Sequence, residues 1–144
     1  SYDLEIKKFW PDIKVSGVAC PFWVPLVEYN EADSPGADYF VKKRIDELMR
    51  KDNDIDTIIL GCTHYPILMP KIIKYVKPGV RIIPQGEYIA DSLKTYLDRH
   101  DTIESQITHG GSCRYYTTEN PDKFKESAQI FLHEKVTVNH VDLE

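Results

Sequence analysis

A predicted strand that runs directly into a thiol and an imidazole constrains the fold of this chain more than any other segment. The run Thr57–Leu60 is almost entirely apolar, which is typical of a strand covered on both faces in a parallel sheet. Gly61 follows and permits a sharp turn, and Cys62, Thr63 and His64 come next. Reactive groups at the carboxyl end of a strand are the usual arrangement in open α/β sheets. We therefore expect thiol and imidazole to share one small loop.

The segments before this strand predict a helix, a strand, an irregular loop and a second helix. A short helix is expected over residues 2–10 and a strand over residues 13–19. The segment Cys20–Glu28 is too rich in proline for a regular helix at its start and too apolar for an exposed loop, so we interpret it as a packed loop at an active site or interface. Ser34 and Pro35 supply a capping hydroxyl and a proline at the first helical position, which predicts a helix that ends near Lys51.

The segments after the thiol loop continue the alternation of helices and strands. A helix is predicted over 67–76 and a strand over 80–83. The next predicted helix has a buried face that carries Tyr88, Ile89, Leu93, Tyr96 and Leu97. After it we expect one or two strands within 102–118 that are broken at Gly110, a helix over 120–132 and a strand over 136–141. This order predicts an α/β fold in which helices flank a parallel sheet.

Composition and charge exclude several classes of protein. The chain has 144 residues, a net charge of −5 and no long cluster of Lys or Arg, which argues against binding to nucleic acid. Its apolar runs are shorter than the ~20 residues of a membrane span, and its start does not resemble a signal peptide, so we expect no membrane association and a cytoplasmic location. Cys20, Cys62 and Cys113 are widely spaced and lack a CxxC pair, which indicates reduced thiols rather than disulfides or a zinc site.

The residues of the thiol loop admit both a structural and a catalytic interpretation. A free cysteine is often a buried structural thiol, but an imidazole and a helix N-terminus nearby both favour the thiolate. Cys62 is therefore a candidate base or nucleophile, with His64 as its partner. Thr63 is either a helix cap or a group that presents a hydroxyl to an anion such as a small carboxylate. Glu28 adjoins an apolar run and is equally consistent with a cleft or a surface position.

Three segments carry a resemblance to a known family. Val18–Pro21, Val24–Glu28 and above all Leu60–Leu68, with its Gly-Cys-Thr-His-Tyr-Pro signature, resemble the C-terminal half of glutamate racemase, in the aspartate/glutamate racemase superfamily. The similarity extends from about residue 13 to residue 97, and residues 115–132 resemble the last section of the family. The chain departs from the family at Gln85, where the corresponding turn often reads Asp-Ser-Gly-Glu.

The resemblance implies racemisation of glutamate by two thiols on opposite faces of the substrate, without pyridoxal phosphate, another cofactor or a metal. Family members supply D-glutamate for peptidoglycan. Cys62 matches one of the two acid/base cysteines, and His64 matches the histidine that assists it. Thr63 matches a residue that contacts the substrate, and Glu28 matches an acidic residue near the site.

The resemblance also implies that half of the catalytic site lies outside this sequence. Family members place the site between two α/β domains; residues 1–83 would belong to the second domain and residues 84–144 to the returning part of the first. The loop that bears the other catalytic cysteine is absent, so we expect a C-terminal fragment that needs the missing N-terminal half and is inactive alone. Unpaired strand edges and an apolar face favour a homodimer or larger oligomers.

Two alternatives remain open from the sequence. One is a related racemase that acts on aspartate or a hydantoin. The other is a non-catalytic module of the same fold that binds a partner protein, or a metal through Cys62 and His64. Turnover assays with several amino acids and metal analysis separate these hypotheses.

Overall fold

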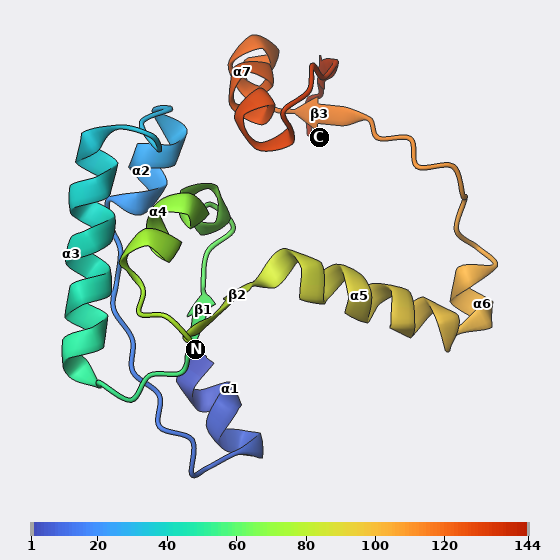
Figure 1. The fold of residues 1–144 in the computed structure, drawn as a ribbon. Coiled ribbons are helices and arrows are strands. Elements are labelled where there is room, and N and C mark those ends of the chain that lie inside the picture. The colour runs from blue at the N-terminus through green and yellow to red at the C-terminus, as the bar shows by residue number, and fades with distance from the viewer. Residues whose placement is uncertain (1, 144) are drawn as a thin grey trace. The chain divides into compact units, whose positions relative to one another are not determined.

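The chain forms two compact units, which divide after Gln85. The computed structural model describes residues 2–143, and its units are Ser1–Gln85 and Gly86–Glu144 (Figure 1). Each contains one two-stranded parallel sheet with helices beside it. The α/β class and the parallel strands expected from the sequence are thus confirmed.

The first unit contains the predicted thiol-bearing strand, and this strand pairs with the next one in the chain. Its elements in order are α1 (Tyr2–Phe9), α2 (Trp23–Glu28), α3 (Pro35–Lys51), β1 (Thr57–Leu60), the 3-10 helix η1 (Tyr65–Leu68), α4 (Met69–Tyr75) and β2 (Arg81–Pro84). Strands β1 and β2 are parallel, with Thr57 opposite Arg81 and Leu60 opposite Pro84. The crossover between them is η1 followed by α4, so the site loop and its helix belong to one βαβ unit.

The core of the first unit lies along one stripe of α3. Ala37, Val41, Ile45 and Met49 recur every fourth residue and are all buried, as expected for the inner face of a helix. Figure 1 shows α3 alongside α2 and α4, and both helices contact it. The buried side chains of these and the neighbouring elements are Trp23, Val27, Ile58, Leu60, Leu68 and Ile72.

The second unit is built around a helix that packs on a short sheet. Its elements are α5 (Gln85–Asp98, which begins at the last residue of the first unit), α6 (Asp101–Glu104), β3 (Tyr115–Thr117), α7 (Pro121–Leu132) and β4 (Val138–His140). Strands β3 and β4 are parallel, and α7 contacts both. Asn120 caps α7, because its Oδ1 accepts hydrogen bonds from the backbone N–H groups of Asp122 and Lys123 at 2.8 and 3.3 Å.

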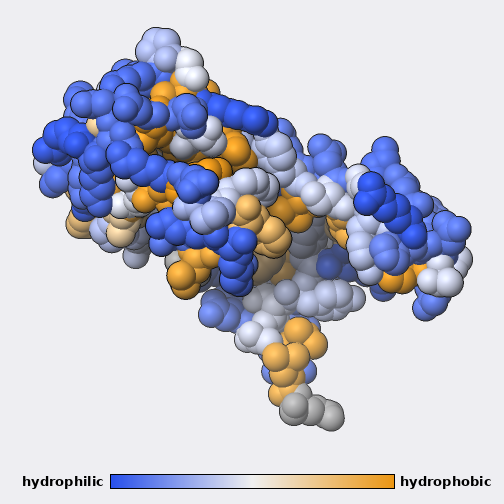
Figure 2. All heavy atoms as spheres, turned by 90° about the horizontal axis from the view of Figure 1, so that it is seen from below, coloured by the Kyte–Doolittle hydropathy of each residue, from blue (hydrophilic) through white to orange (hydrophobic). Residues whose placement is uncertain are grey.

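Many apolar side chains remain exposed, and Figure 2 shows them as orange groups among hydrophilic ones. On β1, Ile58 and Leu60 are buried but Ile59 is 40% exposed, so the expectation of a strand covered on both faces is wrong. The described residues cover only one face of this sheet. On α5, Ile89 and Leu93 are 61% and 55% exposed. The predicted helix is confirmed, but its predicted buried face is exposed because the sheet of its unit packs against α7.

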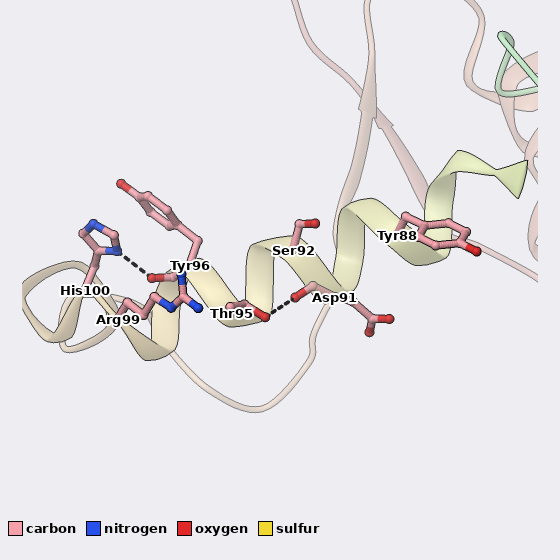
Figure 3. A pocket seen from close by; sticks show the side chains of 7 residues that line it. All are labelled: Tyr88, Asp91, Ser92, Thr95, Tyr96, Arg99 and His100. Carbon is pink, nitrogen blue, oxygen red and sulfur yellow. Dashed lines mark hydrogen bonds between the residues drawn. The ribbon is translucent and has the colours of Figure 1, made fainter. Parts of the chain in front are cut away.

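A shallow hollow follows the exposed side of α5. Its lining side chains, all from this helix and the residues directly after it, are Tyr88, Asp91, Ser92, Thr95, Tyr96, Arg99 and His100 (Figure 3). The ring of Tyr96 stacks on that of His100, with centroids 4.0 Å apart. Nδ1 of His100 lies 2.6 Å from the backbone oxygen of Tyr96. No second element faces these groups within the lining, so the hollow is a surface feature of one helix.

Three predicted segments differ in the structure. Residues 13–19 form no strand; no described strand pairs with them, and the segment is held by the Lys51 ammonium, which donates to the Gly17 carbonyl at 2.8 Å. Within the segment interpreted as a loop, a regular helix forms from Trp23, and Pro25 is tolerated because the first N–H groups of a helix have no intrahelical partner. Residues 101–104 are helical rather than extended, whereas the strand at 115–117 is confirmed.

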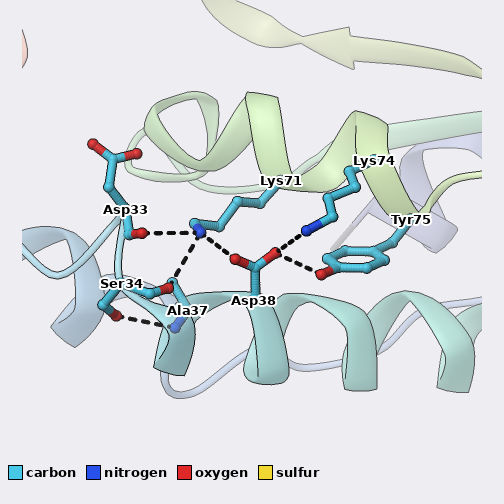
Figure 4. Close-up of polar contacts among 7 residues, drawn as sticks. All are labelled: Asp33, Ser34, Ala37, Asp38, Lys71, Lys74 and Tyr75. Atoms are coloured by element: carbon cyan, nitrogen blue, oxygen red, sulfur yellow. Dashed lines mark hydrogen bonds and ion pairs between the residues drawn. The ribbon is translucent and has the colours of Figure 1, made fainter.

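A polar cluster ties α3 to α4 and so fixes the helix that follows the site loop (Figure 4). The Asp38 carboxylate accepts from the Lys71 ammonium at 2.6 Å, the Lys74 ammonium at 2.9 Å and the Tyr75 hydroxyl at 2.5 Å. Lys71 also donates to the backbone oxygens of Asp33 and Ser34, each at 3.2 Å. Hydrogen bonds from Lys71, Tyr75 and Lys74 hold the pKa of Asp38 well below its ordinary value.

Candidate active site

The loop that follows β1 brings a thiol and an imidazole together. Sγ of Cys62 lies 3.7 Å from Nδ1 of His64, within the reach of a hydrogen bond to sulfur. The backbone N–H of Tyr65 donates to the Cys62 carbonyl at 3.2 Å, which closes the turn between the two side chains. Cys62 is half-buried. The loop can therefore present its sulfur at the surface while keeping an imidazole beside it.

The other side of the imidazole faces a carboxylate. Nε2 of His64 lies 3.0 Å from Oε1 of Glu28, the last residue of α2. An N–H at Nε2 that donates to Glu28 leaves the lone pair of Nδ1 directed toward the thiol. The Glu28 side chain is 60% exposed and that of His64 is 23% exposed. The three residues form a carboxylate–imidazole–thiol series, the arrangement that lets an imidazole take or return a thiol proton.

Thr63 adjoins this series but does not cap a helix. Its Oγ1 lies 3.5 Å from Nδ1 of His64, and η1 begins after His64 without a side-chain cap. The interpretation of Thr63 as a helix cap is therefore wrong. Its hydroxyl is instead exposed next to the thiol and the imidazole, and the predicted contact with substrate remains a prediction.

Behind the loop lies a pair that sequence reasoning missed. The Cys20 thiol donates to the Val18 carbonyl at 3.7 Å, and burial raises its pKa to about 11. Burial, together with the neighbouring Cys20 and Cys62, raises the pKa of Tyr65. The Tyr65 ring also meets the ring of Trp23 edge-on, with centroids 4.8 Å apart. The sequence contained one indication of this position: Tyr65 follows Cys62 by only three residues and precedes Pro66. Its ring therefore has to lie near the same small loop.

Gln85 supports the end of the strand that carries the loop. Its side-chain amide donates to the Leu60 carbonyl at 2.7 Å. Leu60 is the last residue of β1, so this hydrogen bond fixes the strand two residues before Cys62. Gln85 therefore has a structural role at the end of β1.

Neither a metal centre nor a membrane span is evident in the described part of the chain. Among residues 2–143, no three or more His, Cys, Asp or Glu side chains gather where they could hold a metal ion. Cys62 and His64 are therefore two potential ligands without a third on the same side of the imidazole. The Glu28 carboxylate contacts the other ring nitrogen of His64. None of the helices within residues 2–143 has the length and apolar character needed to cross a bilayer.

Comparison with known proteins gives this geometry a context. A curated glutamate racemase of Streptococcus pyogenes serotype M5 is 37% identical to the chain over 142 residues, which are 99% of the chain and 53% of the relative. A crystal structure of a glutamate racemase isoform from Bacillus anthracis superposes with a TM-score of 0.85 at 33% identity, over 99% of this chain and 52% of that one. The chain matches part of a glutamate racemase. No family model matches the sequence.

A second structure extends the comparison to a ligand complex. Glutamate racemase from Francisella tularensis, solved in complex with D-glutamate, superposes with a TM-score of 0.82 at 25% identity. The chain covers 99% of its own length and 52% of that structure. It thus spans about half the length of the glutamate racemases that it matches. The resemblance seen in the sequence is confirmed, and it concerns the C-terminal half of these enzymes.

Proposed function

We propose that this chain is the part of a cofactor-independent glutamate racemase that provides one of its two acid/base thiols, Cys62. The observation that carries the proposal is the position of His64 between Sγ of Cys62 and the carboxylate of Glu28. Similarity to glutamate racemases over nearly the whole chain supports glutamate as the substrate, as does the D-glutamate in one related structure. The product would serve peptidoglycan synthesis in the cytoplasm.

The chemistry requires a base and an acid on opposite faces of one carbon. The thiolate of one cysteine takes the proton from Cα and becomes a thiol, while the electron pair of the broken C–H bond remains on the substrate as a carbanion. The thiol of the other cysteine then returns a proton to the opposite face and becomes a thiolate. Because the Cα–H of an amino acid is a very weak acid, both groups must be held close to it.

His64 and Glu28 would prepare Cys62 for both halves of this cycle. Nδ1 of His64 accepts the proton from the Cys62 thiol, which generates the thiolate that acts as the base. The negative charge of Glu28 at Nε2 stabilises the imidazolium that results. When Cys62 acts as the acid, its thiol gives a proton to the carbanion, and the imidazolium returns a proton to the thiolate that results. Thr63, whose hydroxyl is exposed beside this pair, would bind the substrate.

The proposal assigns residues 1–83 to the second domain of the enzyme and residues 84–144 to the returning part of the first. The division of the chain into two units after Gln85 supports this boundary. A second cysteine on the opposite face would come from the remaining half of the enzyme. Cys20 is a poor substitute because burial raises its pKa, and Cys113 lies in the other unit.

The test is racemisation of glutamate, measured by circular dichroism in both directions. An enzyme that joins this chain to the N-terminal half of a related racemase should be active, and Cys62→Ala and Cys62→Ser should each abolish turnover, since a hydroxyl is far too weak an acid to replace a thiol. Cys113→Ala is the matched control and should retain activity. The 144-residue chain alone should be inactive. Near-normal turnover by Cys62→Ser, or turnover of aspartate in place of glutamate, would refute the proposal.

A further inference from the structure

Gly61, the residue between β1 and Cys62, lies against an aromatic ring. The glycines with positive φ among the described residues are Gly79, Gly110 and Gly111, so the backbone at Gly61 is not in the left-handed region. From the sequence we expected Gly61 to permit a sharp turn, and the turn forms without a left-handed backbone at this residue. A Cβ atom added at this position would lie 3.3 Å from Cε2 and 3.9 Å from Cδ2 of Tyr2, closer than most side-chain contacts allow.

The aromatic ring that fills this space belongs to a residue that is distant in the sequence. Tyr2 is the first residue of α1, and its side chain is 48% exposed. The helix has no buried residue, so it is not part of the core of the unit. The close approach of the Tyr2 ring to Gly61 therefore attaches α1 at a point adjacent to Cys62.

We propose that Tyr2 is a positioning residue for Cys62, acting through the backbone of Gly61; this inference rests on the proposed role of Cys62. The ring limits the movement of the peptide that carries Cys62 and so keeps the thiol at the distance of 3.7 Å from His64. The nearest ring atoms are carbons, so the contact depends on the ring and not on the hydroxyl. Gln85 restrains the same strand end through the Leu60 carbonyl, and Tyr2 restrains the next residue.

The coupling between Cys62 and His64 can be measured in this chain without any turnover. The rate at which iodoacetamide alkylates Cys62 is followed by mass spectrometry at pH 7.5, with the exposed Cys113 as an internal reference. Substitution His64→Ala should slow Cys62 about fivefold or more, in the range expected for directly coupled side chains. In a Tyr2→Ala background the same substitution should change the rate by less than about twofold, because the pair is no longer held together.

Two further variants separate positioning from a general structural role. Tyr2→Phe keeps the ring and should keep the full effect of His64→Ala. Gly61→Ala places a methyl group 3.3 Å from the ring, which must shift slightly, and should reduce that effect in part. Far-ultraviolet circular dichroism and continued protection of the Cys20 thiol, which lies in the same unit, verify that each variant is folded. We expect them to be folded because α1 contributes no buried residue.

The outcomes are distinct. An undiminished effect of His64→Ala in the Tyr2→Ala chain would overturn the inference, as would a Tyr2→Phe chain that behaves like Tyr2→Ala. If His64→Ala has no effect in the parent chain, no coupling exists for Tyr2 to maintain, and the inference also fails. A failure of the racemase proposal appears instead as absent glutamate turnover in the joined enzyme, with the alkylation rates unaffected.

Discussion

Nε2 of His64 lies 3.0 Å from Oε1 of Glu28, a residue 36 positions earlier in the chain. The contact joins the C-terminal end of α2 to the loop after β1 and leaves Nδ1 on the side of Cys62. Because an exposed ion pair contributes about 1 kcal/mol or less to stability, the value of this contact lies in orienting the imidazole.

Replacement of Glu28 by Gln should therefore reduce catalysis and leave the fold intact. The amide still accepts a hydrogen bond from Nε2 but carries no charge to stabilise an imidazolium. We expect kcat for glutamate racemisation by the joined enzyme to fall about tenfold or more, within the range of general acid–base effects. Glu31→Gln, an exposed carboxylate three residues away, is the control and should have normal kcat. Equal kcat values for the two variants would show that Glu28 does not contribute to catalysis.

Asp38→Asn should lower stability at neutral pH, and the loss should shrink in acid. Three donors hold the pKa of Asp38 below its ordinary value of 3.8, so the ionised form stabilises the folded state above that value. This contribution is lost as the pH falls toward the lowered pKa. Urea midpoints of parent and variant should differ fully at pH 7, and the difference should narrow as the pH falls below 3.8.

The control for this measurement lies on the same helix. Asp46 forms one exposed ion pair with Lys42, within α3, at 2.5 Å. Asp46→Asn removes a carboxylate without releasing α4 and should change the urea midpoint much less than Asp38→Asn. An equal change would show that the cluster does not fasten α3 to α4.

The thiol of Cys20 should resist alkylation in the folded chain. Burial raises its pKa from the ordinary value of 9.0 to about 11, so at pH 8 its thiolate is about a hundredfold scarcer than in the unfolded chain. Mass spectrometry after iodoacetamide treatment should show Cys20 protected by at least this factor and released in urea. The exposed Cys113 should change little between the two conditions. Rapid labelling of Cys20 in the folded chain at pH 8 would contradict its burial against Tyr65.

Two neighbouring isoleucines of α4 provide a matched test of the core. Ile72 is fully buried, whereas Ile73 is 59% exposed. Ile72→Ala should reduce the free energy of unfolding by about 2–5 kcal/mol, as for other buried truncations. Ile73→Ala should change it by about 0.5 kcal/mol or less. Chemical unfolding of both variants measures the difference, and similar values would mean that α4 is rotated relative to this structure.

The sequence predicts those parts of the fold that depend on local signals. Ser34 accepts a hydrogen bond from the backbone of Ala37 at 3.2 Å, as expected for the cap of the helix that begins at Pro35. The strand at Thr57–Leu60 and the loop that follows it were also predicted correctly. In each case a short stretch of sequence specifies the backbone, so no distant partner has to be known.

Features that depend on distant partners could not be predicted. Residues 13–19 have the alternation of a strand but find no strand beside them, and alternation alone cannot supply a partner. Ile59 has the character of a buried residue, yet its exposure depends on what covers the sheet. The approach of Glu28 to His64 was left undecided for the same reason, since adjacency to an apolar run does not specify where α2 will pack. The ring of Tyr2 gave no signal at all, because its contact with Gly61 spans most of the unit.

The crossover that links β1 to β2 has a consequence for the order of folding. Residues 61–80 connect two strands that pair directly. Within this connection Cys62 and His64 are only two residues apart. Contacts so close in sequence form early, because the loops that they close are short. Glu28 reaches His64 only when a loop of 36 residues closes, at an entropic cost of roughly 3 kcal/mol. The thiol–imidazole pair should therefore form before α2 docks and completes the site.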